Sequence, residues 1–166
     1  MLQIRAVFAI FILSGAISAV SAQSTGLVIQ ISAEAHVGPA TIPLSFTVTS
    51  PGETVTNQPV TVTAWVRALP GQQIQLTSQI ASLTGPDGSH AVTALSWNGT
   101  MGRVTGGATS ASCTSGTVSG GSAQSMISGW SLSGIATCKV SFSLTTDATW
   151  PAGTYTGLAV LSLLAQ

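Results

Sequence analysis

Charged side chains are scarce in this chain. Of its 166 residues only four are Lys or Arg and four are Asp or Glu, and the cations do not cluster along the sequence. A nucleic-acid-binding domain carries a basic patch or stripe, and a segment that binds anionic lipid carries a run of Lys and Arg. Neither pattern occurs, so we expect no nucleic-acid partner and a surface built from Ser, Thr, Gln and Gly.

Catalysis needs titratable groups, and few exist here. His36 follows Glu34 by two residues, so on a strand the two side chains point the same way. The carboxylate and the imidazole could act together as a general base, but an ordinary solvated strand face is the preferred interpretation. His90 shares a turn with Asp87. No Gly-x-Ser-x-Gly elbow, paired carboxylates or phosphate-binding glycine loop is present. The sequence predicts a non-enzymatic protein with no cofactor and no metal site.

Cysteine is limited to Cys113 and Cys138. In an exported chain a single pair is read first as a disulfide, with two buried free thiols as the alternative. A structural zinc needs four ligands, which two cysteines without a nearby histidine do not supply. We expect a Cys113–Cys138 disulfide.

The N-terminus has the order of a secretory signal peptide. A short start with Arg5 precedes an apolar run over residues 6–17, and small residues at 19–22 form a cleavage site before Gln23. The apolar run is shorter than the roughly 20 residues that span a bilayer, although an uncleaved anchor is the alternative. We expect residues 1–22 to be removed and residues 23–166 to form one domain, secreted to the periplasm, the cell surface or the medium. No later stretch is apolar enough to form a membrane-spanning helix.

Apolar and polar residues alternate with a period of two through most of residues 23–166, which is typical of half-buried strands. Gly and Pro clusters interrupt the alternation, and no segment shows helical spacing with caps. Pro43 cannot donate to a ladder, so its strand should lie at a sheet edge. The sequence predicts an all-β, two-sheet antiparallel, immunoglobulin-like β-sandwich, with strands near residues 25–34, 42–48, 60–67, 74–80, 91–97, 138–145 and 154–165.

Two connections stand out. Asn98-Gly99 is a hairpin-turn signal; with Thr100 it also matches a glycosylation acceptor, for which the turn is the preferred interpretation. Residues 105–129 are rich in Gly, Ser and Thr with few apolar anchors. Such a segment buries little surface, so we expect a loose loop that the disulfide fastens to the following strand.

Tryptophan is the most suggestive aromatic, with four copies against one tyrosine. We expect two of the four to be buried, and we take Trp97 and Trp130 as candidates for an exposed ring that contacts a glycan or a protein.

The C-terminal strand, residues 154–165, is apolar on both faces. Tyr155, Ala159, Leu161 and Leu163 alternate with Leu158, Val160 and Leu164. Such a strand is either covered on both sides or meets another molecule with its outer face. Leu158, Val160 and Leu164 are therefore our candidates for a partner contact.

The turn into that strand, residues 150–157 (WPAGTYTG), resembles the closing segment of bacterial exported immunoglobulin-like sandwiches, the spore-coat-protein-U-like and fimbrial-subunit-like families. The resemblance covers about the last 20 residues and the layout of signal peptide, short strands and one disulfide. The chain departs from chaperone–usher pilins in lacking the penultimate aromatic residue of their last strand, and its cysteines lie late in the chain.

The functional hypothesis that follows is an exported structural or adhesive surface protein that associates with itself or another protein, such as a pilus-like or coat-like subunit. The alternative is a secreted module that binds glycan or protein through exposed tryptophans.

Overall fold

The computed structural model describes residues 32–92, 95–118 and 120–165. The predicted signal peptide, residues 1–22, and residues 25–31 of the first predicted strand lie outside the described residues. Within the described part, the only helical element is a single 3-10 turn, η1 (Gly107–Ser110), and no helix could cross a membrane.

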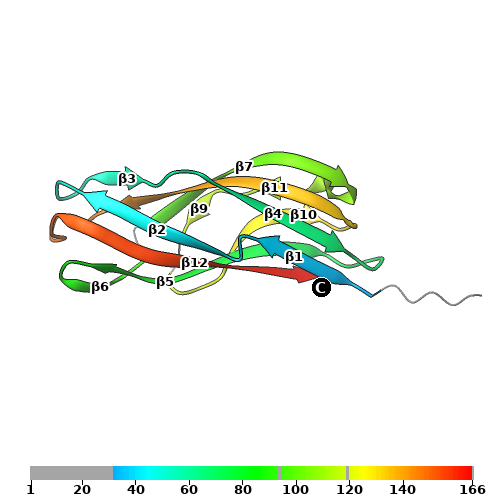
Figure 1. Cartoon of the computed structure of the whole chain (residues 1–166), viewed down its shortest axis with the longest axis horizontal. Coiled ribbons are helices and arrows are strands. Elements are labelled where there is room, and N and C mark those ends of the chain that lie inside the picture. Colours follow the sequence, from blue (N-terminus) through cyan, green and yellow to red (C-terminus); the bar gives the residue numbers. More distant parts are fainter. Residues whose placement is uncertain (1–31, 93–94, 119, 166) are drawn as a thin grey trace, which may run out of the picture. The chain divides into compact units, whose positions relative to one another are not determined.

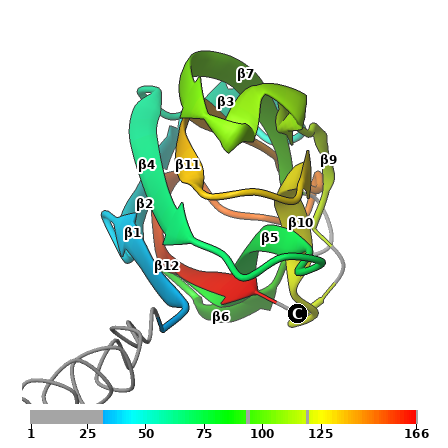
Figure 2. The same ribbon diagram turned by 90° about the vertical axis from the view of Figure 1, so that its right-hand side faces the viewer.

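The strands form two antiparallel sheets that pack face to face, as the sequence predicts (Figures 1 and 2). Sheet A has the order β1-β4-β11-β7-β9, with β3 also paired to β11. Its members are β1 (Glu34–Gly38), β3 (Thr54–Thr56), β4 (Val60–Arg67), β7 (Leu95–Gly106), β9 (Gly116–Thr117) and β11 (Gly134–Thr145).

Sheet B has the order β2-β12-β5-β10-β8, with β6 also paired to β5. The chain crosses from sheet A to sheet B at Gly38-Pro39, between β1 and β2. The members of sheet B are β2 (Thr41–Val48), β5 (Ile74–Gly85), β6 (Gly88–Ala91), β8 (Ser112–Cys113), β10 (Gln124–Trp130) and β12 (Gly153–Ala165).

The core lies between the sheets and follows from the two-residue period. On β2 every second residue is buried, and β4 and β11 alternate in the same way. Burying one large aliphatic or aromatic side chain contributes about 1.5–3 kcal/mol, and each of these three strands buries two to four such side chains. The largest fully buried side chains include Phe46, Met126, Trp130, Phe142 and Tyr155.

β12 is a central strand. It pairs with β2 from Gly153 to Val160 and with β5 from Thr156 to Ala165. β2 is an edge strand of sheet B, which confirms the prediction made from Pro43. The C-terminal strand is therefore bonded on both sides while its outer face remains free of covering elements in the described part of the chain.

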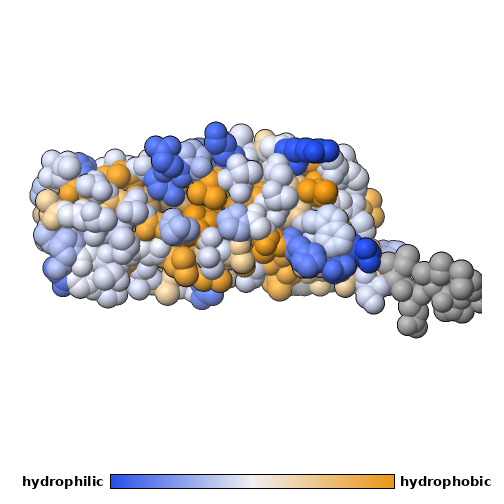
Figure 3. Space-filling view, in the orientation of Figure 1, coloured by the Kyte–Doolittle hydropathy of each residue, from blue (hydrophilic) through white to orange (hydrophobic). Residues whose placement is uncertain are grey.

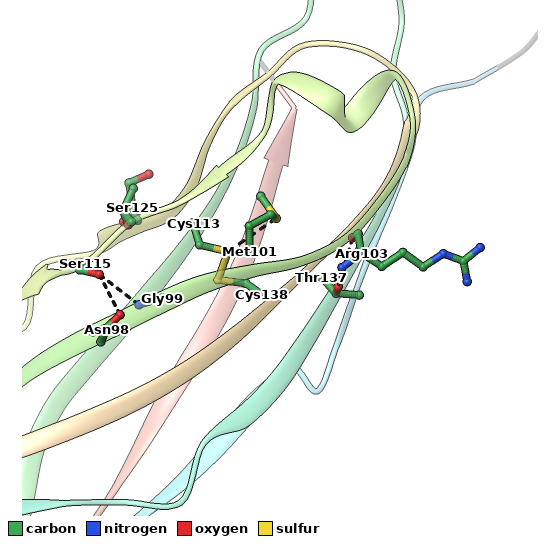
Figure 4. Close-up of a disulfide and its surroundings, with 10 residues drawn as sticks. Asn98, Gly99, Met101, Arg103, Cys113, Ser115, Ser125, Thr137 and Cys138 are labelled. Carbon is green, nitrogen blue, oxygen red and sulfur yellow. Dashed lines mark hydrogen bonds between the residues drawn. A yellow bond between two sulfur atoms is a disulfide. The ribbon is translucent and has the colours of Figure 1, made fainter.

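The disulfide joins the two sheets. Cys113 on β8 of sheet B and Cys138 on β11 of sheet A form the predicted bond, with their Cα atoms 6.0 Å apart (Figure 4). Cys138 is fully buried between Ala136 and Val140. The bond thus fastens the short edge strand β8 to a central strand of the opposite sheet.

The segment predicted as a loose loop, residues 105–129, is largely ordered, and that prediction is wrong. It contains the end of β7, η1, β8, β9 and β10. Met126 and Ile127 are buried and anchor it. Its glycines allow close packing: a Cβ on Gly116 would lie 2.8 Å from the Trp97 ring. These glycines allow neighbouring strands to approach closely. In the sequence alone, glycines with this role look the same as glycines in a loop.

The prediction of a hairpin turn at Asn98-Gly99 is also wrong. Both residues lie in the middle of β7, where Asn98 pairs with Ser141 and Gly99 with Val140. A side chain at Gly99 would meet the Thr114 carbonyl at 2.4 Å and Cys113 at 3.1 Å. Because Gly99 has no side chain, the link between β8 and β9 can cross β7 at this point. The tight hairpin turn earlier in the chain is Gly85–Gly88, between β5 and β6.

The disulfide closes a loop with a sequence separation of 25 residues, and the chain-entropy model gives it roughly 3–4 kcal/mol of stability. We expect Cys113→Ser/Cys138→Ala to lower the free energy of unfolding in urea by about that amount. Dithiothreitol should lower the stability of the wild type similarly and leave the variant unchanged. Equal unfolding midpoints for oxidised and reduced wild type would contradict this assignment.

Candidate functional site

The pair predicted from sequence, Glu34 and His36, exists on the outer face of sheet A. The imidazole Nε2 lies 2.9 Å from Glu34 Oε1, and Arg67 Nη1 lies 3.7 Å from Glu34 Oε2. The hydrogen bond from His36, with the nearby charge of His36 and Arg67, lowers the pKa of Glu34. All three side chains are about half exposed or more. No serine or cysteine is hydrogen-bonded to His36 among the described residues.

Beside this pair lies Trp65, which is only partly buried. Its ring centroid is 5.4 Å from that of His36, and the Arg67 guanidinium carbon is 5.5 Å from the ring. His36 pairs with Trp65 across β1 and β4, and Ile135 pairs with it across β11. An aromatic ring with an imidazole and a guanidinium beside it can contact both the apolar and the polar parts of a ligand.

The second histidine lies in a cluster at the end of sheet B. His90 Nε2 is 2.7 Å from Asp87 Oδ1, and the His90 ring is 4.2 Å from the Trp150 ring and 5.3 Å from the Tyr155 ring. Trp150 and Tyr155 stack at 5.0 Å. The Tyr155 hydroxyl donates to the Pro151 carbonyl at 2.7 Å.

This cluster holds the β5–β6 turn against the turn that precedes β12. A Cβ on Gly85 would lie 2.3 Å from the Tyr155 ring, and one on Gly153 would lie 2.3 Å from Pro86. Tyr155 is fully buried, and its hydroxyl is engaged by the Pro151 carbonyl. The arrangement locks the β5–β6 hairpin against the turn that precedes β12.

The tryptophans divide as two buried and two partly buried, which confirms the expected number but not the expected identities. Trp97 is 7% exposed and Trp130 is fully buried, so these two rings do not face a ligand, and their assignment as contact residues is wrong. Trp97 shares its strand face with buried Leu95. Trp65 lies out of phase with the buried residues of β4, and this phase in the sequence is the signal that identifies it as outward-facing.

The apolar outer face of β12 is exposed. Leu158, Val160 and Leu164 are 48%, 45% and 43% exposed. Pro43 pairs with Leu158 on β2 and is also exposed. A shallow hollow of about 450 Å³ lies here, lined by Gln79, Ala81, Ser82, Leu158 and Val160. We call Leu158, Val160 and Leu164 the β12 strip. In the orientation of Figure 1, hydrophobic residues occur among polar ones over β2 and β12 (Figure 3).

Among the described residues, no group of three or more His, Cys, Asp or Glu side chains is placed to hold a metal ion. Comparison with protein-family models, with curated proteins and with solved structures finds no match. The resemblance of the last strand to exported sandwich proteins therefore remains a prediction.

Titration of the single tyrosine, Tyr155, tests whether its hydroxyl is buried in this cluster. Burial, with the charge of Asp87, raises the pKa of Tyr155 above its ordinary value of 10.0. Because the folded protein holds the phenol proton more tightly, this contribution to stability is present below pH about 10 and is lost as the pH rises through the folded-state pKa.

We expect absorbance at 295 nm to show phenolate formation at a higher pH in the native protein than in the protein unfolded by urea. Because the chain has one tyrosine, Tyr155→Phe should abolish the signal and remove this alkaline loss of stability. Identical titrations in native and unfolded protein would show that the hydroxyl is not buried.

Proposed function

We propose that this protein is an exported, non-enzymatic structural or adhesive protein whose copies associate through the β12 strip. The observation that carries the proposal is the exposure of three large aliphatic side chains on one face of a central strand. A half-buried strand needs apolar residues on one face only. Large apolar side chains exposed together on a polar surface are characteristic of a protein–protein contact.

The surroundings of the strip favour a second copy of the same chain as the partner. The residues across from it on β2 and β5 are neutral: Thr41, Pro43, Gln75, Gln79 and Ala81. No charge must lose its hydration when two such faces meet, and no like charges oppose each other. Sheets pack face to face at about 10 Å with their strands nearly aligned, and an uncharged sheet face permits such packing. A chain with formal charge near zero also has little repulsion between copies.

Export is supported by two features of the chain. The N-terminal 22 residues have the composition of a secretory signal, and the cysteine pair is placed to form a disulfide, which persists in oxidising compartments. The similarity of residues 150–157 to exported coat-like and fimbrial-like sandwiches agrees with this location. A non-enzymatic role is favoured because each histidine is paired with a carboxylate but with no nucleophile in the described chain.

The proposal predicts self-association that depends on the β12 strip. We expect the sedimentation coefficient of the mature protein to rise with concentration, and electron micrographs at high concentration to show assemblies. Leu158→Thr/Val160→Thr should weaken association at least about tenfold, because two aliphatic side chains are no longer buried in the contact.

Leu69→Thr/Leu132→Thr is the matched control. Leu69 is 43% and Leu132 57% exposed, and both lie in turns outside the strip. The control should associate like the wild type. A monomer at all concentrations, or equal loss of association in both variants, would refute the proposal.

A further inference from the structure

The cationic and acidic side chains of the described chain lie in different parts of the structure. Arg67 is on β4, Arg103 on β7 and Lys139 on β11, all in sheet A. Each of these side chains points outward. Arg67 follows buried Val66 and Lys139 follows buried Cys138, so each lies on the opposite face of its strand from the core. Arg103 projects away from the inter-sheet disulfide (Figure 4). Every Lys and Arg of the described chain is therefore on the outer face of sheet A.

Three of the four acids lie elsewhere, at one end of the sandwich. Glu53 precedes β3, Asp87 is in the β5–β6 turn and Asp147 is in the β11–β12 turn. These turns adjoin one another, since Thr146 donates to the Glu53 carbonyl at 3.0 Å and Gly153 lies against Pro86 (Figure 1). Only Glu34 shares a sheet with the cations. The outer face of sheet A is thus positive in a molecule that has almost no net charge.

The cations on this face are available to a ligand. Neither Arg103 nor Lys139 forms an ion pair within the described chain, and Arg67 approaches Glu34 only at 3.7 Å. Lys139 borders a hollow of about 240 Å³ lined otherwise by Pro59, Asn98, Thr100 and Ser141. Its lining offers an ammonium, an amide and two hydroxyls, which are donors for carboxylate, sulfate or sugar hydroxyl oxygens.

Between this hollow and Trp65 runs a hydroxyl-bearing surface. Its outward side chains on β4 and β11 are Thr61, Thr63 and Thr137. Arg67 lies one residue beyond the Val66–Gly134 pair, so it stands six residues along β11 from Lys139, about 20 Å at roughly 3.4 Å per residue. The surface is therefore long and polar, with cations spread along it and one partly exposed indole near its end.

We propose that the outer face of sheet A binds an extended acidic polysaccharide, one that carries carboxylate or sulfate groups on its sugar rings. The separated cations match separated acid groups, the threonine and serine hydroxyls match sugar hydroxyls, and Trp65 offers an apolar surface to a sugar ring. The guanidinium of Arg67 beside that ring can bind an acid group on the same sugar.

This chemistry favours a polysaccharide over a nucleic acid. Nucleic-acid-binding proteins neutralise many closely spaced phosphates, commonly six to ten, and stack bases on several aromatic residues. This face has three cations and one indole. It also lies on the opposite sheet from the β12 strip, so polysaccharide binding and self-association involve different surfaces.

The test is binding of the mature protein to immobilised heparin and polygalacturonate, with dextran as the neutral polymer and oligo(dT) as the nucleic acid. We expect binding to at least one acidic polysaccharide in 50 mM NaCl and about tenfold weaker binding in 500 mM NaCl. Arg103→Gln/Lys139→Gln should weaken it at least about tenfold, and Trp65→Leu should weaken it without changing the salt dependence.

Ser45→Glu/Thr84→Glu is the control, because it lowers the net charge by the same amount on the outer face of sheet B. It should bind like the wild type. The proposal is overturned if no acidic polysaccharide binds, if dextran or oligo(dT) binds as tightly, or if both charge variants lose binding equally. Salt-sensitive self-association that disappears in Arg103→Gln/Lys139→Gln would instead assign this face to the acidic end of a second copy.

Discussion

The structure depends on the pairing of its last strand. β12 is bonded to β2 along one side and to β5 along the other, so the last strand in sequence is a central strand of sheet B. It contributes Tyr155, Ala159 and Leu161 to the core. Its pairing also gathers distant parts of the chain, since β2 and β5 do not pair with each other. Sheet B, the buried cluster around Tyr155 and the exposed β12 strip all follow from the placement of this one strand.

The two sheets have different outer surfaces because the charge is so unevenly placed. The outer face of β12 carries the three exposed aliphatic side chains of the strip, and its paired neighbours on β2 and β5 in the described chain are uncharged, which suits contact with another sheet of the same kind. Sheet A carries the described cations with hydroxyls between them, which suits a hydrated anionic polymer. A chain with few charges can keep these surfaces separate, because placing three cations on one face is enough to define it. Association and ligand binding can then occur on opposite sides of one small sandwich.

The fold was predictable where the two-residue period was clear. The buried residues of β2, β4 and β11, the edge position signalled by Pro43 and the disulfide all follow from local pattern and chemistry. Residues 105–129 and Asn98-Gly99 were not predictable, because glycine has two uses. It permits turns, and it also permits close contact between strands, as at Gly99 and Gly116. The phase of Trp65 on β4 was visible in sequence, whereas the gathering of Arg67, Arg103 and Lys139 required the strand order.

Hydroxyl-radical footprinting of the mature protein at increasing concentration is the sharpest test of whether copies associate through the β12 strip. If they do, labelling of Leu158, Val160 and Leu164 falls as the concentration rises, while labelling of Leu69 and Leu132 stays constant. Tyr155, which lies in the core, should be protected at every concentration. If labelling of the strip is independent of concentration while Tyr155 stays protected, copies do not associate through this face.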